Sequence, residues 1–154
     1  MNYGKIISTE PDRLGQMVNI RYVEEITNTP VLSFFLRNMA QLIDRGHSTQ
    51  AIPSTAKLKA VYAEMDGQVV GHIVFDILDG HIPRTSWIVL SAIDDAYQRR
   101  GLYTILHRHF EAWSLKLNCP KIASFVHVDN LVRQASCSQV GMKPVYYRME
   151  KELG

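Results

Sequence analysis

The spacing of the apolar residues changes abruptly in the middle of this chain, and that change constrains the fold most. The run from Trp87 to Leu90 is continuously apolar and leads to the acidic pair Asp94-Asp95, which is typical of a buried strand. From Leu102 the apolar residues recur at helical spacing, and Asn118 followed by Pro120 predicts the end of that helix. The pattern predicts a buried strand followed closely by an amphipathic helix.

The turn between this strand and helix is rich in hydrogen-bond donors, with the sequence Tyr97-Gln98-Arg99-Arg100-Gly101. The first N–H groups of a helix have no partner inside it, and the helix dipole adds partial positive charge there. A strand-turn-helix junction with a glycine can therefore hold a phosphate, and two arginines strengthen the attraction. The alternative is an ordinary turn with two solvated arginines.

Two motifs in this half of the chain resemble those of the GNAT superfamily of acyl-CoA-dependent N-acyltransferases. Residues 98 to 103, QRRGLY, resemble the Q/R-x-x-G-x-G/A signature that binds the coenzyme A pyrophosphate, with Tyr103 where the family has Gly or Ala. Asn130 and Gly141 have the spacing of the N-x(10)-G-F element, with Met142 in place of the aromatic residue. The resemblance covers residues 58 to 151.

The order of predicted elements agrees with that resemblance. Two strands flank the hairpin signal Asp66-Gly67, and a third follows a turn at Asp79-Gly80. A helix, a strand, a short helix and a last strand come next. The predicted segments are strands at 58–65, 69–78, 85–93, 121–128 and 145–151, and helices at 102–117 and 130–139.

The N-terminal part predicts one strand and two helices before the main sheet. A short strand spans residues 4 to 9, and Asp12 caps an uneven helix that reaches Val23. A cleaner helix starts at Thr29-Pro30 and stops at Gly46. The loop from His47 to Ser54 is predicted to be exposed, and the resemblance implies that it forms part of the acceptor-binding wall.

Composition allows an ordinary globular protein: 154 residues, 46% hydrophobic, 21% charged and a net charge of +2. That charge is too small to indicate a nucleic-acid-binding protein. No apolar run approaches a membrane span and the N-terminus lacks a signal-peptide pattern, so we expect a cytoplasmic location. Cys119 and Cys137 lack zinc-site spacing and are expected to be reduced thiols. We predict an α/β fold, with a single GNAT-like domain over residues 1–154 and a mixed β-sheet flanked by helices.

The resemblance implies roles for particular residues in coenzyme binding. The backbone of Ile93 pairs with the pantetheine amides like an added strand. The Ser91 N–H points at the thioester oxygen, where negative charge grows as an amine attacks, so Ser91 counts among the catalytic residues. The coenzyme site as a whole consists of Ile93, Gln98, Arg99, Arg100, Gly101, Leu102, Tyr103 and Asn130.

The general base is less well indicated, because the strand from Trp87 to Leu90 carries no carboxylate where many family members have Glu. An amine with a pKa of about 10 must lose a proton before it attacks. His127, at the end of its strand, has a suitable ordinary pKa, and an ordinary hydrogen-bonded histidine is the alternative. The other candidate bases are Asp94, His72 and Asp76.

The general acid is also uncertain from the sequence, because Cys137 stands where the family's usual tyrosine would be. A thiol can donate a proton to the leaving thiolate, with Ser136 or Tyr103 as substitutes, while a packed cysteine without a role is the alternative. Solvent can also protonate a thiolate. In the predicted helix 102–117, His107, Arg108 and His109 are expected to lie on the solvent side.

The function implied by the resemblance is transfer of an acetyl or short acyl group from acyl-CoA to a primary amine by direct attack. The co-substrate is acetyl-CoA or another short acyl-CoA, and no metal is expected. The acceptor is a small molecule or a protein, and a nucleic acid is not indicated. A homodimer is possible because exposed strands at sheet edges often pair with another chain. The alternative is a coenzyme A-binding protein of the same fold with lost or altered chemistry that acts on, or binds, a protein or nucleic-acid partner.

Overall fold

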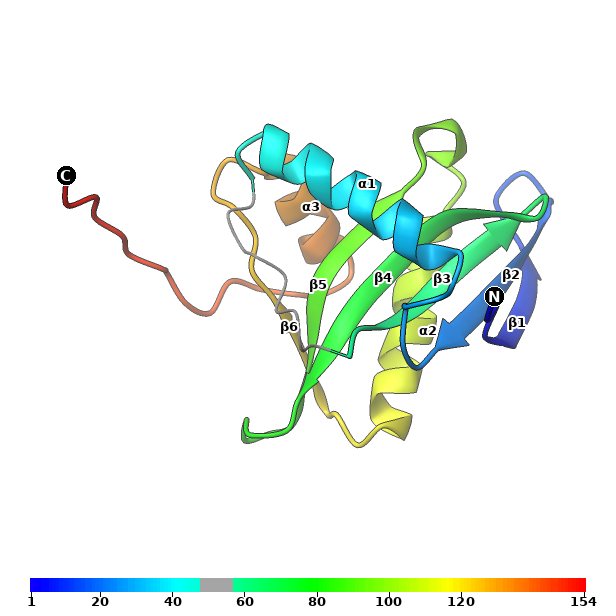
Figure 1. Ribbon diagram of the computed structural model, residues 1–154, viewed down its shortest axis with the longest axis horizontal. Helices are drawn as coiled ribbons and strands as arrows, with labels where there is room; N and C mark the ends of the chain where they lie inside the picture. The colour runs from blue at the N-terminus through cyan, green and yellow to red at the C-terminus, as the bar shows by residue number, and fades with distance from the viewer. Residues whose placement is uncertain (48–56) are drawn as a thin grey trace.

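The computed structural model describes residues 1–47 and 57–154 and forms a six-stranded sheet with helices packed on its faces (Figure 1). The strands lie in chain order, β1 to β5 are antiparallel, and β6 runs parallel to β5. This arrangement confirms the predicted mixed sheet flanked by helices. The elements are β1 (Lys5–Pro11), β2 (Met17–Val23), α1 (Val31–Asp44), β3 (Lys59–Met65), β4 (Gln68–Leu78), β5 (Thr85–Ile93), the 3-10 turn η1 (Asp95–Tyr97), α2 (Leu102–Lys116), β6 (Lys121–Ser124) and α3 (Leu131–Gln139).

Helix α2 covers one face of the sheet with the apolar stripe that the sequence predicts. Leu102, Leu106 and Phe110 are buried and join the core that includes Ile73 and Phe75 of β4. The Phe75 and Phe110 rings meet edge to face with centroids 4.9 Å apart. This packing holds α2 against the middle of the sheet, mainly on β4.

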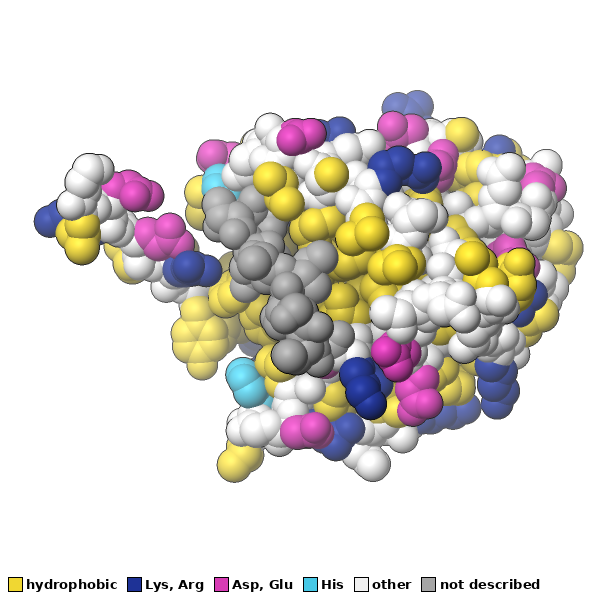
Figure 2. All heavy atoms as spheres, viewed as in Figure 1, with side chains coloured by type: hydrophobic (Ala, Val, Ile, Leu, Met, Phe, Trp, Pro, Cys, Tyr) yellow, Lys and Arg dark blue, Asp and Glu magenta, His cyan; other side chains and the backbone are white. Residues whose placement is uncertain are grey.

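Helix α1 covers the opposite face, where its buried residues Val31 and Phe35 share a core cluster with Tyr62 and Val74 of the sheet. Figure 2 shows this face, with apolar side chains gathered over the middle of the sheet beside α1 and charged side chains mainly around the rim. The two faces of the sheet are therefore both buried, each by one helix.

The hairpin between β3 and β4 confirms the turn signal Asp66-Gly67. Both residues have positive φ, 53° for Asp66 and 72° for Gly67, as a two-residue hairpin turn with the twist of its strands requires. The helix predicted from Thr29-Pro30 is also confirmed as α1.

The helix predicted from Asp12 to Val23 is wrong, because the segment forms a tight turn and strand β2. Asp12 Oδ1 accepts hydrogen bonds from the N–H groups of Leu14 and Gln16 and so closes a turn instead of starting a helix. Val18 and Ile20 are both completely buried, two residues apart, on a strand that pairs with β1 and β3. Among the described residues before β3, there is one helix and not two.

The C-terminal prediction is wrong in two places. Strand β6 ends at Ser124, four residues before the predicted end at Val128. Residues 145–151, predicted as a last strand, form no strand, and Tyr146 and Tyr147 are 87% and 89% exposed. Residues with high β propensity do not hold a strand without a neighbouring strand to pair with.

The predicted loop from His47 to Ser54 lies, apart from His47, outside the described residues. Among the helices of the described part of the chain, none is long and apolar enough to cross a bilayer.

Candidate functional site

Strand β5 has an open backbone edge next to the end of β6. The two strands pair only from Thr85–Lys121 to Ile88–Ser124, while β5 continues to Ile93 alongside β4. The Asp94 N–H donates to Val70 O on β4, and backbone groups alternate between the two sides of an antiparallel strand. The backbone N–H groups of Ser91 and Ile93 therefore face the side that β6 leaves unpaired.

The side chain of Gln98 fastens the turn to that open edge. Its amide Nε2 donates to the carbonyl of Ile93 at 2.9 Å. The Ile93 carbonyl lies on the unpaired side of β5, as expected from the alternation of backbone groups between the two sides of a strand. The Ile93 N–H lies on the same side of the strand.

The turn before α2 takes up a strained backbone conformation. Arg99 has φ of 62° and Gly101 has φ of 79°, both in the left-handed region that only glycine adopts without cost. Helix α2 begins at Leu102, and no side chain of the described residues caps it. Its first N–H groups are free to bind an anion.

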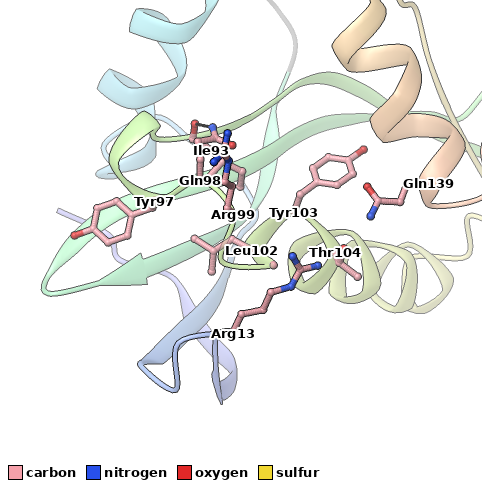
Figure 3. A pocket seen from close by; sticks show the side chains of 10 residues that line it. Arg13, Ile93, Tyr97, Gln98, Arg99, Leu102, Tyr103, Thr104 and Gln139 are labelled. Carbon is pink, nitrogen blue, oxygen red and sulfur yellow. Dashed lines mark hydrogen bonds between the residues drawn. The ribbon is translucent and has the colours of Figure 1, made fainter.

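A cavity of about 160 Å³ lies at this helix start (Figure 3). It is bounded by the end of β5, the turn, the first turn of α2 and the end of α3. None of the ten described residues that line it is acidic, and two are arginines, so its chemistry suits a negatively charged ligand. The lining residues are Arg13, Ile93, Tyr97, Gln98, Arg99, Gly101, Leu102, Tyr103, Thr104 and Gln139.

The two arginines of the predicted phosphate loop lie in different places. Arg99 lines the cavity, whereas the Arg100 guanidinium bonds to Gln16 and Asp12 of the β1–β2 turn. It also lies 4.8 Å from the centre of the Tyr97 ring. Arg100 is therefore not arranged to contact a ligand in the cavity through its side chain, although its backbone belongs to the turn.

Arg13 lines the cavity without having been predicted to do so. It belongs to the β1–β2 turn, and its backbone N–H donates to Arg100 O at 3.0 Å. The sequence holds one signal for this turn, the composition Pro11-Asp12-Arg13-Leu14-Gly15, but nothing in it relates residue 13 to residue 101.

Tyr103 forms one wall of the cavity and does not close it. Its hydroxyl accepts a hydrogen bond from Arg133 of α3 at 2.6 Å, so the ring is held toward α3 (Figure 3). Burial raises the pKa of the Tyr103 hydroxyl, and the Arg133 guanidinium opposes that shift. The site thus accommodates the larger residue at the place where the family has Gly or Ala.

Asn130 caps α3. Its side-chain oxygen accepts from the Arg133 N–H at 3.1 Å, which satisfies one of the free donors at that helix start. The residue does not line the cavity. Contact between Asn130 and a pantetheine arm remains a prediction.

His127 has a hydrogen bond that determines its neutral tautomer. Its Nδ1 lies 3.1 Å from the Asp129 N–H, which can only donate. The proton of the neutral ring is then on Nε2. The ring also stacks on His47, with centroids 5.6 Å apart. The histidine lies beyond the end of β6, on a segment that departs from β5.

The remaining candidate bases are occupied or inaccessible. His72 is fully buried, and burial lowers its pKa to about 4, so its ring is neutral at pH 7. Asp94 accepts from the Ala96 N–H and lies 3.8 Å from Arg37. Asp76 accepts from the Ile77 N–H.

The candidate proton donors on α3 differ in accessibility. Cys137 is 8% exposed and lies near enough to Tyr103 to raise the pKa of the Tyr103 hydroxyl, as a minor cause after burial. The Ser136 hydroxyl donates to Val132 O, within its own helix. Neither side chain lines the cavity.

The prediction that both histidines of α2 face solvent is wrong for His107. This residue is 1% exposed, and its Nδ1 lies 3.2 Å from Glu111 Oε2. Burial lowers the pKa of His107. Arg108 and His109 both bond to Glu10 of β1, and Arg108 is the more exposed of the two.

Solved structures with the same fold include several acetyltransferases. A ribosomal-protein-alanine N-acetyltransferase from Brucella melitensis biovar Abortus 2308 is 13% identical with a TM-score of 0.66, over 88% of this chain and 99% of that one. The aminoglycoside N-acetyltransferase AAC(6')-Iy in complex with CoA is 17% identical with a TM-score of 0.65, over 90% of this chain and 96% of that one.

A third structure is described as a "predicted acetyltransferase with acetyl-CoA" from Clostridium acetobutylicum, 16% identical with a TM-score of 0.63, over 88% of this chain and 96% of that one. At these identities the likeness shows the fold alone. No curated protein matches by sequence. The profile of the Acetyltransferase (GNAT) family, however, matches residues 24–142, which is more than half of the chain. The chain belongs to the GNAT family of acetyltransferases.

Proposed function

We propose that this protein transfers an acetyl or short acyl group from acyl-CoA to a primary amine by direct attack, with residues 1–154 acting as one domain. The observation that supports this most is the cavity at the start of α2, which has free backbone donors, no acidic lining among the described residues, and the unpaired edge of β5 beside it. The names of the similar structures, two of them with CoA or acetyl-CoA, agree with this co-substrate.

The coenzyme is held by backbone groups more than by side chains. The N–H groups from Arg99 to Tyr103 take the diphosphate at the positive end of α2. The Ile93 N–H bonds to a carbonyl of the pantetheine arm, which lies along β5 like an added strand. Gln98 keeps the Ile93 carbonyl occupied and so holds the turn in place for this arm.

The Ser91 N–H stabilises the charge that develops on the thioester oxygen when the amine attacks. It faces the unpaired side of β5, two residues before Ile93, and is fixed there by the pairing of β5 with β4. A donor that is already oriented costs no reorganisation as the charge forms.

Proton transfer involves His127 and the α3 side of the site. The His127 Nε2 carries the ring proton in the observed geometry. For Nε2 to accept a proton from the amine, Nδ1 must become the donor, and the Asp129 carboxylate, 3.8 Å away, is its nearest acceptor. The leaving thiolate takes a proton from Cys137, from Tyr103 or from solvent.

The acceptor is a primary amine on a small molecule or on a protein. The names of the similar structures include both an aminoglycoside acetyltransferase and a ribosomal-protein-alanine acetyltransferase, and they do not choose between these classes.

The first test is release of free thiol from acetyl-CoA with a panel of aminoglycosides, polyamines, amino acids and peptide N-termini. Thiol release that depends on one amine class supports the proposal. Coenzyme binding without turnover on any of these amines overturns the transferase assignment in favour of a coenzyme-binding protein.

The second test replaces the backbone donor at position 91. Ser91→Pro removes an N–H that does not take part in the β4 pairing, and we expect kcat to fall about 10² to 10³-fold with little change in coenzyme affinity. Ser91→Ala is the matched control and retains kcat. Equal kcat in Ser91→Pro and Ser91→Ala, with both folded, overturns the role of this N–H.

A further inference from the structure

We propose that Arg13, delivered by the β1–β2 turn, binds a phosphate of the coenzyme, and that Arg100 serves to hold Arg13 in place. This inference rests on the proposed coenzyme site and adds a contact from a part of the chain far from the predicted phosphate loop in sequence. The phosphate is either the diphosphate or the ribose 3′-phosphate, and the test below distinguishes them.

The β1–β2 turn is rigidly attached to the start of α2. Asp12 is buried, and its Oδ1 accepts from the N–H groups of both Leu14 and Gln16. The Arg13 N–H donates to Arg100 O at 3.0 Å, and the Arg100 guanidinium lies 3.5 Å from Asp12 Oδ2. The Arg100 guanidinium also donates to Gln16 Oε1, so one backbone hydrogen bond, one ion pair and one side-chain hydrogen bond join the two segments.

The Arg13 side chain lies directly over Gly101. A β-carbon at residue 101 would be 3.2 Å from Arg13 Nε and 3.3 Å from its Cγ, so a larger residue there would displace the arginine. In this position Arg13 forms part of the cavity wall where α2 begins.

The charge of Arg13 is not neutralised by the protein. Within residues 1–47 and 57–154, no carboxylate lies within 4 Å of its guanidinium, in contrast to Arg100, which is paired with Asp12. An unpaired guanidinium beside a cavity without acidic lining attracts an anion, and its planar donors match a phosphate.

The position of Arg13 indicates which end of the ligand it contacts. Figure 3 shows Ile93 and Arg13 on opposite sides of Leu102, and all three line the cavity. A coenzyme with its pantetheine arm at Ile93 crosses the start of α2 and presents its phosphate-rich end to Arg13.

The test compares Arg13→Gln with the wild type by calorimetric titration of CoA, dephospho-CoA and pantetheine, with Arg148→Gln in the exposed C-terminal segment as the charge-matched control. We expect Arg13→Gln to weaken CoA binding about fivefold to tenfold, as expected for loss of one partly exposed charge-assisted contact, and to leave pantetheine binding unchanged. Arg13→Lys should recover part of the loss, because it keeps the charge.

The dephospho-CoA titration identifies the phosphate. A loss of the same size with CoA and dephospho-CoA assigns Arg13 to the diphosphate, and a loss only with CoA assigns it to the 3′-phosphate; both support the proposal. A change in CoA affinity no larger than that of Arg148→Gln overturns it while leaving the coenzyme site intact. Failure of the wild type to bind CoA overturns the proposed function as well.

The role of Arg100 is tested by a double-mutant cycle. If Arg100 acts through Arg13, Arg100→Gln weakens CoA binding in the wild type but adds little in Arg13→Gln, and neither change affects pantetheine. An equal loss in both backgrounds means that Arg100 binds the ligand itself, which overturns its positioning role. Thermal unfolding of all variants checks that the fold is retained.

Discussion

Helix α2 begins at the cavity and helix α3 ends there, and the first turns of the two helices are satisfied in different ways. At α3 the Asn130 side chain accepts from the Arg133 N–H and completes an ordinary cap. At α2 the residue before the helix is Gly101, in a left-handed conformation, and no described side chain caps the helix. The first N–H groups of α2 therefore have no side-chain acceptor among the described residues, unlike those of α3.

The first N–H groups of a helix can bind an anion only where no other acceptor takes them, and the proposed coenzyme site lies at the helix start that meets this condition. The side chain of Asp94, one of the two acidic residues just before the turn, caps η1 and not α2. The hydrogen bond from Arg133 to the Tyr103 hydroxyl joins α3 to the first turn of α2.

The largest expected effect is loss of coenzyme binding in Gly101→Glu. A glutamate there adds a negative charge at the proposed phosphate site, is strained at φ of 79°, and meets the Arg13 side chain. We expect acetyl-CoA affinity to fall at least about 100-fold, equivalent to about 2.7 kcal/mol, measured by calorimetric titration.

The control for this change is Gly46→Glu at the C-terminal end of α1. Gly46 has φ of 71°, and a β-carbon added to it would meet no described residue within 4 Å, so the variant carries the same backbone strain away from the cavity. Affinity that survives in Gly101→Glu, or is lost equally in Gly46→Glu, would contradict the assignment of the α2 start.

A smaller effect is expected from Tyr103→Phe, which removes the hydrogen bond between α2 and α3. The change removes the acceptor of a partly buried guanidinium, and the free energy of unfolding should fall by about 1.5 kcal/mol. Tyr97→Phe, whose hydroxyl makes only a long, exposed contact with Asp66, should cost less than about 0.5 kcal/mol. Equal midpoints in urea unfolding of the two variants would show that the Arg133–Tyr103 hydrogen bond does not contribute to stability.

Asn130→Ala sharpens the contrast from the α3 side. Loss of the cap should lower the free energy of unfolding by about 1 kcal/mol, and Asn130→Ser should restore most of it because serine also caps helices. If Asn130 acts only as a helix cap, coenzyme affinity falls with stability in Asn130→Ala and recovers with it in Asn130→Ser. Affinity that stays low in Asn130→Ser, with stability restored, would instead indicate that Asn130 contacts the pantetheine arm.

The central strand, turn and helix were predictable from sequence because each has a strong local signal. The hairpin at Asp66-Gly67, the strand that ends at Ile93 and the helix that begins at Leu102 follow from turn chemistry and apolar period. The segment Met17–Val23 was misread because its apolar residues allow both periods, and only pairing with strands on both sides makes it a strand.

The site was predictable only where its residues are close in sequence. The turn from Gln98 to Gly101 was found, whereas Arg13, which is far from it in sequence, depends on that misread segment being a strand. The paired state of Arg100 also depends on long-range contacts with Asp12 and Gln16. Burial of His107 could not be read from α2 alone, because it depends on packing against neighbouring elements.

The smallest expected effect is a pH dependence of stability from His107, which lies on α2 next to Tyr103 with ring centroids 5.7 Å apart. Burial lowers the pKa of His107 in the folded state, so the unfolded chain takes up a proton first as the pH falls below about 6.5. The stability contributed by neutral His107 is present in full above that pH and is lost as the pH falls.

We expect the urea midpoint of the wild type to fall between pH 7.5 and pH 5.5, and to fall less in His107→Gln. His72 adds a loss in the same direction to both proteins, because its pKa is lowered to about 4, so only the difference between them reports on His107. An identical fall in the two proteins would show that His107 is accessible to protons in the folded state, and that the contact between α2 and α3 is looser than the structure indicates.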